Sequence, residues 1–302
     1  MTPPAPFGRV LTAMATPFDA EGALDLDGAA RLARWLVDNG SDGLVVAGST
    51  GESTALDDGE KADLWRAVAE AVDVPVVAGA GTAGTAHSVE LTRVAEAAGA
   101  AAVLAVTPYY SRPSQAGIAA HFRAVAGCTS LPVVLYDIPV RTGRRIGEET
   151  LLKLAHDVGN IVGVKDATGD PAGTARLLAR APAGFAVYSG DDSLTLPLLA
   201  VGACGVIGVA THWSGVLHGR MIDAYLAGRV DEARALNARL IDSFAFETGD
   251  SAPNPLPTKA VLRVLGLPAG QCRLPLGPAP EGLEDRARQV LAGLGGDAPN
   301  VA

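Results

Sequence analysis

The stretch Ile161-Val162-Gly163-Val164-Lys165-Asp166-Ala167-Thr168-Gly169-Asp170 joins a short apolar run to a charged end. A run of about five residues that is apolar throughout, rather than alternating, is typical of a strand buried on both faces of a parallel sheet. Similar runs recur along the chain at fairly even spacing, at 9–14, 43–47, 74–78, 102–106, 132–136, 186–189 and 205–209. Together with 161–165 they predict eight buried parallel strands.

Stretches with helical periodicity separate these runs, at 27–39, 59–72, 87–98, 148–156, 171–180 and 194–201. Eight strands with interleaved helices predict an α/β fold of the (β/α)8 TIM-barrel type, with a doubly wound open sheet as the alternative. After residue 208 the strands stop, and helices are expected at 215–227, 230–246, 258–265 and 283–294. We therefore expect a barrel domain at residues 1–229 and a C-terminal helical domain at 230–302.

Composition excludes several classes of protein. Of the 302 residues, 48% are hydrophobic and 19% charged, which indicates a folded chain. The formal net charge of −9 argues against nucleic-acid binding. No run of eighteen apolar residues predicts a membrane span, and the N-terminus lacks a signal-peptide core, so a cytoplasmic protein is expected. The widely spaced Cys128, Cys204 and Cys272 indicate buried thiols in a reducing compartment, and the histidine spacing indicates no metal site.

Only four of the 24 basic residues are lysines, which limits any chemistry that needs an amine nucleophile. Lys61 and Lys153 lie on helix-like stretches beside polar neighbours, where a solvated face is expected, and Lys259 lies at a helix start. Lys165 alone ends an apolar strand, where desolvation lowers the pKa of an amine and activates it. The alternative is that Lys165 extends past the strand end and pairs with Asp166.

Other strand ends also carry polar groups. The loop Gly48-Ser49-Thr50-Gly51-Glu52-Ser53 follows the second strand, and it can either bind a carboxylate or cap the next helix. Tyr109 and Tyr110 follow the fourth strand, and Tyr136 ends the fifth. Arg141 then offers either a carboxylate clamp or a solvated charge. Residues 79–84 fit GxGxxG but lack the acidic residue expected about 20 positions later, which favours tight-turn glycines over a dinucleotide site.

In their order and spacing, these motifs resemble the dihydrodipicolinate synthases, of the pyruvate-dependent class I aldolase superfamily that also holds the N-acetylneuraminate lyases. The resemblance covers nearly the whole chain and rests on TAMATPF (12–18), GSTGES (48–53), TPYY (107–110), YDIPVRT (136–142), GVKDATGD (163–170), SGDD (189–192) and NPLPTK (254–259). It implies a (β/α)8 barrel with a C-terminal helical domain and a lyase that needs neither a metal nor a nucleotide. That lyase condenses pyruvate with aspartate 4-semialdehyde to 4-hydroxy-tetrahydrodipicolinate, in lysine and diaminopimelate biosynthesis.

The resemblance also implies a role for individual residues. Lys165 would form an imine with pyruvate, and Tyr136 would act as the general acid and base. Thr50 would link Tyr136 to Tyr110, with Tyr110 inserted from a neighbouring subunit of a homotetramer built as a dimer of dimers. The substrate-binding groups would be Ser49 and Thr50 for the pyruvate carboxylate, Arg141 for the semialdehyde carboxylate, and Gly190 and Ile207 through their carbonyls.

Two departures leave alternatives open. Ser49 stands where synthases more often carry threonine, and residues 208–213 differ from the usual end of the eighth strand. A pyruvate-imine aldolase or dehydratase for sugar acids, or a catalytically silent metabolite-binding paralogue, are the alternatives. Lysine-inhibited relatives typically carry His, Asn and Glu where this chain has Asp58 (or Lys61), Ala83 and His87. We therefore expect lysine to inhibit weakly or not at all.

Overall fold

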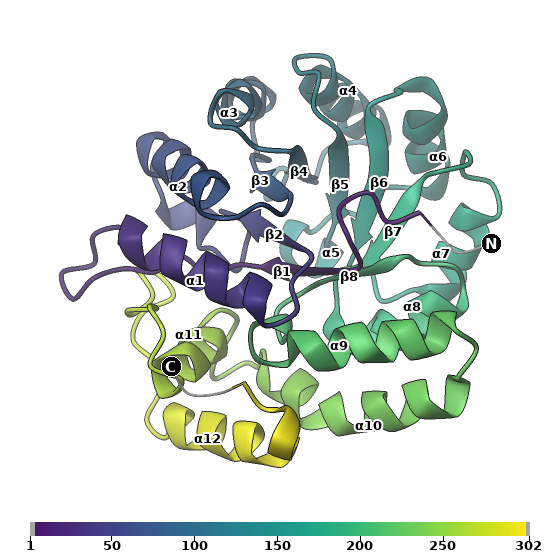
Figure 1. Ribbon diagram of the computed structural model, residues 1–302. Helices are drawn as coiled ribbons and strands as arrows, with labels where there is room; N and C mark the ends of the chain where they lie inside the picture. Colours follow the sequence, from purple (N-terminus) through teal and green to yellow (C-terminus); the bar gives the residue numbers. More distant parts are fainter. Residues whose placement is uncertain (1–3, 300–302) are drawn as a thin grey trace.

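The computed structural model describes residues 4–299, and its centre is a closed barrel of parallel strands (Figure 1). Each strand pairs with the next in chain order, and β1 pairs with β8 to close the ring. The strands are β1 (Val10–Ala13), β2 (Gly43–Val46), β3 (Val76–Gly79), β4 (Ala102–Val106), β5 (Val133–Asp137), β6 (Ile161–Asp166), β7 (Ala186–Ser189) and β8 (Gly205–Gly208). All eight expected strands are confirmed, and the open-sheet alternative is wrong.

Helices surround the barrel and connect its strands, as the periodicity predicted (Figure 1). They are α1 (Leu26–Asp38), α2 (Asp58–Ala71), α3 (Thr85–Ala97), α4 (Gln115–Ala126), α5 (Pro139–Thr142), α6 (Glu148–Asp157), α7 (Pro171–Leu178), α8 (Thr195–Ala200) and α9 (Thr211–Leu226). Sequence reasoning missed α4 and the single turn α5. The α4 helix has a recognisable start, because the Ser114 side chain accepts a hydrogen bond from the Gly117 amide.

Three further helices follow α9, namely α10 (Val230–Phe246), α11 (Leu256–Val264) and α12 (Leu283–Leu294). They lie beside α9 and α1 at one side of the barrel (Figure 1). Their buried side chains, including Leu240, Val261 and Leu291, belong to the same hydrophobic cluster as Leu32 of α1 and Leu217 of α9. The C-terminal helices therefore share one core with the barrel's outer layer.

The glycines of the GxGxxG stretch let neighbouring strand ends approach each other closely. A Cβ on Gly79 would lie 2.4 Å from the Ala47 carbonyl oxygen, and one on Gly81 would lie 2.4 Å from the Val106 nitrogen. Both distances are too short for any side chain. These glycines thus bring the ends of β2, β3 and β4 together, in agreement with the tight-turn interpretation.

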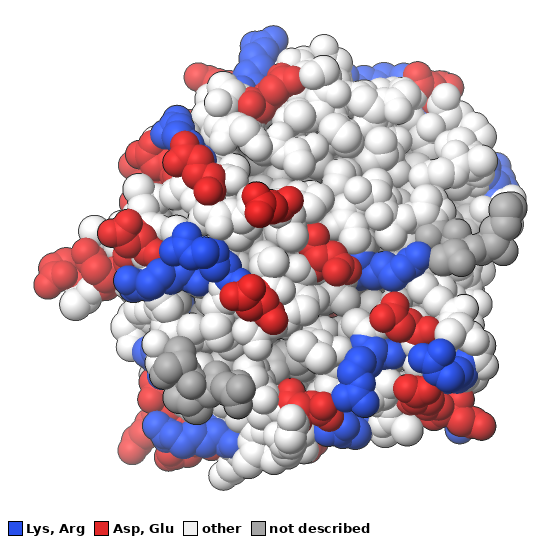
Figure 2. Space-filling model, viewed as in Figure 1, with Lys and Arg blue, Asp and Glu red and all other residues white. Residues whose placement is uncertain are grey.

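Acidic and basic side chains are interspersed over the face of the molecule shown in Figure 2. Residues 4–299 contain no helix that is both long enough and apolar enough to cross a bilayer. Within the same range, no three or more His, Cys, Asp and Glu side chains are grouped so as to bind a metal ion. All three cysteines are unpaired; Cys204 and Cys272 are buried as expected, whereas Cys128 is only half-buried.

Candidate active site

Lys165 and Tyr136 lie on neighbouring strands at the carboxyl end of the barrel. They are register partners on β6 and β5, and the Lys165 Nζ lies 4.5 Å from the centroid of the Tyr136 ring. Both side chains are buried, with 4% and 5% of each residue exposed. The barrel interior therefore brings an amine and a phenol together away from bulk water.

Burial changes the acidity of both groups. It lowers the pKa of Lys165 to about 8, because a charged ammonium loses its solvation, while the carboxyl groups of Asp192 and Glu247 act in the opposite direction. It also raises the pKa of Tyr136 to about 12, against the lowering effects of Arg141 and a hydrogen bond with Ser49. Near neutral pH Lys165 thus has an appreciable neutral fraction, while Tyr136 keeps its proton.

Lys165 does not pair with Asp166, the alternative left open by the sequence. The Asp166 carboxylate accepts hydrogen bonds from the Thr168 amide at 2.9 Å, the Thr168 hydroxyl at 2.7 Å and the Thr174 hydroxyl. Successive residues of a strand point to opposite faces, so Asp166 faces the outer layer where Lys165 faces inward. The Lys165 stem instead passes Gly190, where a Cβ would lie 2.9 Å from the Lys165 Cγ.

The loop after β2 places its two hydroxyls differently from the expectation. Ser49, not Thr50, makes the hydrogen bond with Tyr136. The Thr50 hydroxyl is buried and accepts a hydrogen bond of 2.9 Å from the side-chain amide of Asn254. The role of Thr50 as the link to Tyr136 stays a prediction, and the structure favours Ser49 in that position. Neither hydroxyl caps α2, because the N-cap of that helix is Asp57, in a capping box with Glu60.

Tyr110 and Arg141 lie at the rim of the barrel. Tyr110 is 95% exposed and has a positive φ of 68°, so its ring projects away from its own chain. Arg141 lies on α5 and is exposed, yet its charge lowers the pKa of both Tyr136 and Lys165. The charge of Arg141 therefore acts on both groups from the rim of the barrel.

The other two expected substrate-binding residues flank the same region. Gly190 follows β7 and donates its amide to the Asp166 carbonyl at 2.8 Å, and Ile207 is a buried residue of β8. Their roles toward a substrate stay predictions.

Two further lysines are buried. Lys259 is completely buried in α11 and forms a 2.6 Å ion pair with Glu52, and it also donates to the Gln271 carbonyl at 3.0 Å. Lys61 is 6% exposed and lies 3.4 Å from Asp58, so the prediction of a solvated Lys61 is wrong. Lys153 is exposed as expected. Sequence reasoning could not foresee the Glu52–Lys259 pair, because the partners lie 207 positions apart.

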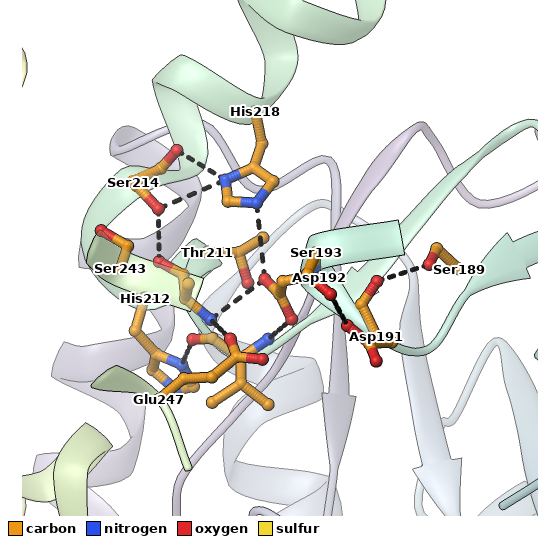
Figure 3. Close-up of polar contacts among 12 residues, drawn as sticks. Ser189, Asp191, Asp192, Ser193, Thr211, His212, Ser214, His218, Ser243 and Glu247 are labelled. Carbon is orange, nitrogen blue, oxygen red and sulfur yellow. Dashed lines mark hydrogen bonds and ion pairs between the residues drawn. The ribbon is translucent and has the colours of Figure 1, made fainter. Parts of the chain in front are cut away.

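A buried acidic cluster beside the end of β8 also escaped the sequence analysis (Figure 3). Asp192 follows β7, and Glu247 follows α10. Both carboxyl groups accept a hydrogen bond from the amide of Ala210, at 3.1 Å and 3.2 Å. The motif SGDD indicated Asp192 by its resemblance, but Glu247 carried no signal in the sequence.

His212 lies just after β8 and hydrogen-bonds the backbone on both sides of the β8–β1 junction. Its Nδ1 donates to the Val209 carbonyl at 2.7 Å, so its Nε2 accepts the amide of Ala15 at 3.0 Å. Burial lowers the pKa of His212 to about 4, which keeps the ring neutral. The unusual sequence at 208–213 therefore includes a histidine that joins β8 to the chain after β1.

Comparisons with known proteins identify the family of the chain. The model of the dihydrodipicolinate synthetase family matches residues 6–293. The 4-hydroxy-tetrahydrodipicolinate synthases of Acidothermus cellulolyticus and Moorella thermoacetica are 55% and 53% identical to the chain. The alignments cover 97% and 89% of this chain and 94% and 92% of those proteins.

Solved structures give the same result. The dihydrodipicolinate synthase of Cyanidioschyzon merolae with lysine bound has a TM-score of 0.93 and 43% identity, over 96% of this chain and 98% of that chain. That of Bacillus anthracis has a TM-score of 0.90 and 42% identity, over 94% and 97%. The chain belongs to the dihydrodipicolinate synthetase family.

Proposed function

We propose that this protein is a lyase that condenses pyruvate with aspartate 4-semialdehyde to 4-hydroxy-tetrahydrodipicolinate. The observation that carries the proposal is the buried Lys165 beside Tyr136, with its pKa lowered to about 8, in a chain of this family. A neutral amine there can attack the keto carbon of pyruvate, and loss of water with uptake of one proton leaves a cationic imine. Loss of a methyl proton then gives an enamine, which attacks the aldehyde carbon of the second substrate.

Each proton transfer needs a positioned donor and acceptor. Tyr136 is the proposed acid and base, because its ring lies beside the amine and its hydroxyl keeps its proton near neutral pH. Ser49 is the proposed next member of the relay, since it is the hydroxyl that hydrogen-bonds Tyr136. Tyr110 of a second subunit would complete the relay. The hydroxyls thus pass protons without a fixed charge.

Two separate groups of residues are proposed to bind the two substrates. Ser49 and Thr50 are proposed to hold the pyruvate carboxylate, with Gly190 and Ile207 contributing their carbonyls to the wall of the site. Arg141 at the rim is proposed to bind the carboxylate of the semialdehyde, since a planar guanidinium matches a carboxylate in two parallel hydrogen bonds.

The reaction needs no metal or nucleotide, because the imine itself supplies the electron sink. We further propose a cytoplasmic homotetramer, in which residues 1–229 form the catalytic barrel and residues 230–302 a helical domain. The exposed Tyr110 supports an assembly in which one subunit completes the site of another.

Reductive trapping tests the proposal directly. Borohydride reduction in the presence of pyruvate, followed by peptide mass analysis, should place a pyruvate-derived adduct on Lys165, and Lys165→Arg should lose it. Arg141→Ala should reduce turnover with aspartate semialdehyde far more than it reduces adduct formation. Absence of the adduct in the unaltered protein would refute the imine mechanism, and equal losses in Arg141→Ala would refute its assigned role.

A further inference from the structure

In the acidic cluster beside the end of β8, two carboxyl groups accept a hydrogen bond from the same backbone amide. Ala210 offers a single amide hydrogen, which both Asp192 and Glu247 accept, and Asp192 also accepts the amide of Val209 at 2.8 Å (Figure 3). Asp192 is fully buried and Glu247 nearly so. Two carboxylates so close in a dry site repel each other strongly, so one of them retains its proton.

Glu247 is the carboxyl that keeps the proton. Burial raises the pKa of Glu247 well above its usual range, and the charge of Asp192 and a hydrogen bond to it raise that pKa further. Asp192 has two backbone amide donors, whereas Glu247 has one, so the negative charge is better solvated on Asp192. The protonated Glu247 can then donate to the Asp192 carboxylate.

The neighbouring histidine does not cancel this charge. His218 Nδ1 lies 2.9 Å from the Ser214 carbonyl, which can only accept, so Nδ1 carries the ring's hydrogen. Burial lowers the pKa of His218, so its Nε2, 3.4 Å from Asp192, stays unprotonated. His218 therefore leaves the negative charge of Asp192 in place.

This charge acts on Lys165. The negative charge of the Asp192–Glu247 pair opposes the effect of burial on the pKa of the Lys165 amine. A Cβ on Gly208 would lie 2.5 Å from the Asp192 Oδ1, just as one on Gly190 would touch the Lys165 stem. The titratable groups that face this region are Lys165, Tyr136, Arg141, Asp191, Asp192, His212, His218 and Glu247.

We propose that Asp192 and Glu247 share one proton and carry a single negative charge that serves as the counter-ion of Lys165 and of its cationic imine. The inference rests on the proposed function, since it assigns the imine its partner. Both residues are positioning residues, because they act on the lysine and do not touch the substrate. The charge stabilises the cation when water leaves, and it no longer has a cationic partner once the methyl proton is lost and a neutral enamine forms.

Two isosteric variants separate the roles of the carboxyls. Glu247→Gln replaces a protonated acid with a neutral amide donor, so the pH midpoint of imine formation should stay within about 0.3 unit of the unaltered protein. Asp192→Asn removes the charge, so the midpoint should fall by about one unit and imine formation above the midpoint should slow about tenfold. Asp137→Asn is the matched control, because Asp137 is buried but points to the Ile146 amide on the outer side of β5.

Equal shifts in the two variants would show that both acids are ionised, and no shift in either would show that neither acts on Lys165; each result overturns the proposal. Infrared spectroscopy gives a second measurement that needs no catalysis and no folded Asp192→Asn. At pH 8.5, where Asp137 with its pKa of about 7 is ionised, the stretch of a protonated carboxyl group should be present and should vanish in Glu247→Gln. Its absence from the unaltered protein would also overturn the proposal.

Failure of pyruvate to form any adduct would instead refute the proposed function, and the infrared result would still stand.

Discussion

Two neighbouring buried carboxyl groups in this barrel accept hydrogen bonds from different numbers of donors. Asp137 and Asp166 are register partners on β5 and β6, and both are buried. Asp166 has three hydroxyl or amide donors, whereas both oxygens of Asp137 share the single amide of Ile146 at 3.2 Å. Burial, aided by the charge of Asp166, raises the pKa of Asp137 to about 7. Burial with a single amide donor therefore leaves the Asp137 carboxylate poorly solvated and favours its protonated form.

Asp137→Asn should stabilise the protein increasingly as pH rises. The folded-state pKa of Asp137 lies above its unfolded value, so its ionisation costs stability as pH rises from about 4 to about 7, and the amide removes that cost. The stability gained by the variant should grow by about 2–3 kcal/mol between pH 5 and pH 8. Urea denaturation of both proteins at each pH measures it. A difference that stays constant with pH would contradict the raised pKa.

At the scale of residues, the sequence predicted the buried amine but not the hydroxyl that contacts Tyr136. Lys165 could be predicted because an apolar strand determines burial locally. Ser49 and Thr50 could not be told apart, because they lie in a turn between two residues with positive φ, Ala47 and Glu52, where no periodicity indicates direction. Only the folded loop shows that Ser49 faces Tyr136 while Thr50 faces Asn254.

At the scale of elements, the C-terminal segment holds the loop after β2. Asn254 donates to the Thr50 hydroxyl, and Lys259 of α11 pairs with Glu52 of the same loop. The second Glu52 oxygen accepts the Arg273 amide at 2.8 Å. All three contacts join residues more than 200 positions apart, so no local pattern predicts them. The helical segment thus supports the loop that carries Ser49.

Breaking the Glu52–Lys259 pair should destabilise the protein strongly. Lys259→Met leaves the Glu52 carboxylate buried without its cation, which should cost about 3–5 kcal/mol. The double variant Lys259→Met/Glu52→Gln removes both charges and should recover most of that loss. Urea denaturation measures each free energy of unfolding. Lys153→Met, at an exposed position, is the control and should change it by less than about 0.5 kcal/mol. A double variant no more stable than Lys259→Met would argue against a desolvated charge as the cause.

The contact between α2 and α3 bears on regulation by lysine. His87 Nε2 lies 2.9 Å from the Asp58 carboxylate, which also lies 3.4 Å from the Lys61 amine. Because Asp58 is already paired with two basic groups, we expect lysine to inhibit weakly or not at all. Steady-state rates with and without millimolar lysine test this. Strong inhibition in that range would show the prediction to be wrong.

At the scale of the whole molecule, the barrel could be predicted because parallel strands are local apolar runs, and closure follows from their number. Contacts between subunits could not be predicted from such local patterns. Tyr110 projects from a loop that is fixed to its own barrel, since Arg112 donates to the Gly143 carbonyl at 2.9 Å and Arg144 donates back to Arg112. A large, almost fully exposed aromatic side chain on an anchored loop is suited to contact with a second copy of the chain.

Mixing two inactive variants tests whether Tyr110 acts in a neighbouring subunit. Tyr110→Ala keeps Lys165, and Lys165→Arg keeps Tyr110, so a mixed pair of subunits would contain one site with both groups. Each variant alone should have less than about a tenth of the original activity, because each step of proton transfer or imine formation contributes tenfold or more. Unfolding and refolding them together should restore up to about a quarter, the fraction of sites that random pairing makes complete. Tyr225→Ala, on the outer helix α9, replaces Tyr110→Ala in the control and should be active without mixing. If the mixture gains nothing while size measurements show mixed assemblies, Tyr110 serves its own subunit or none.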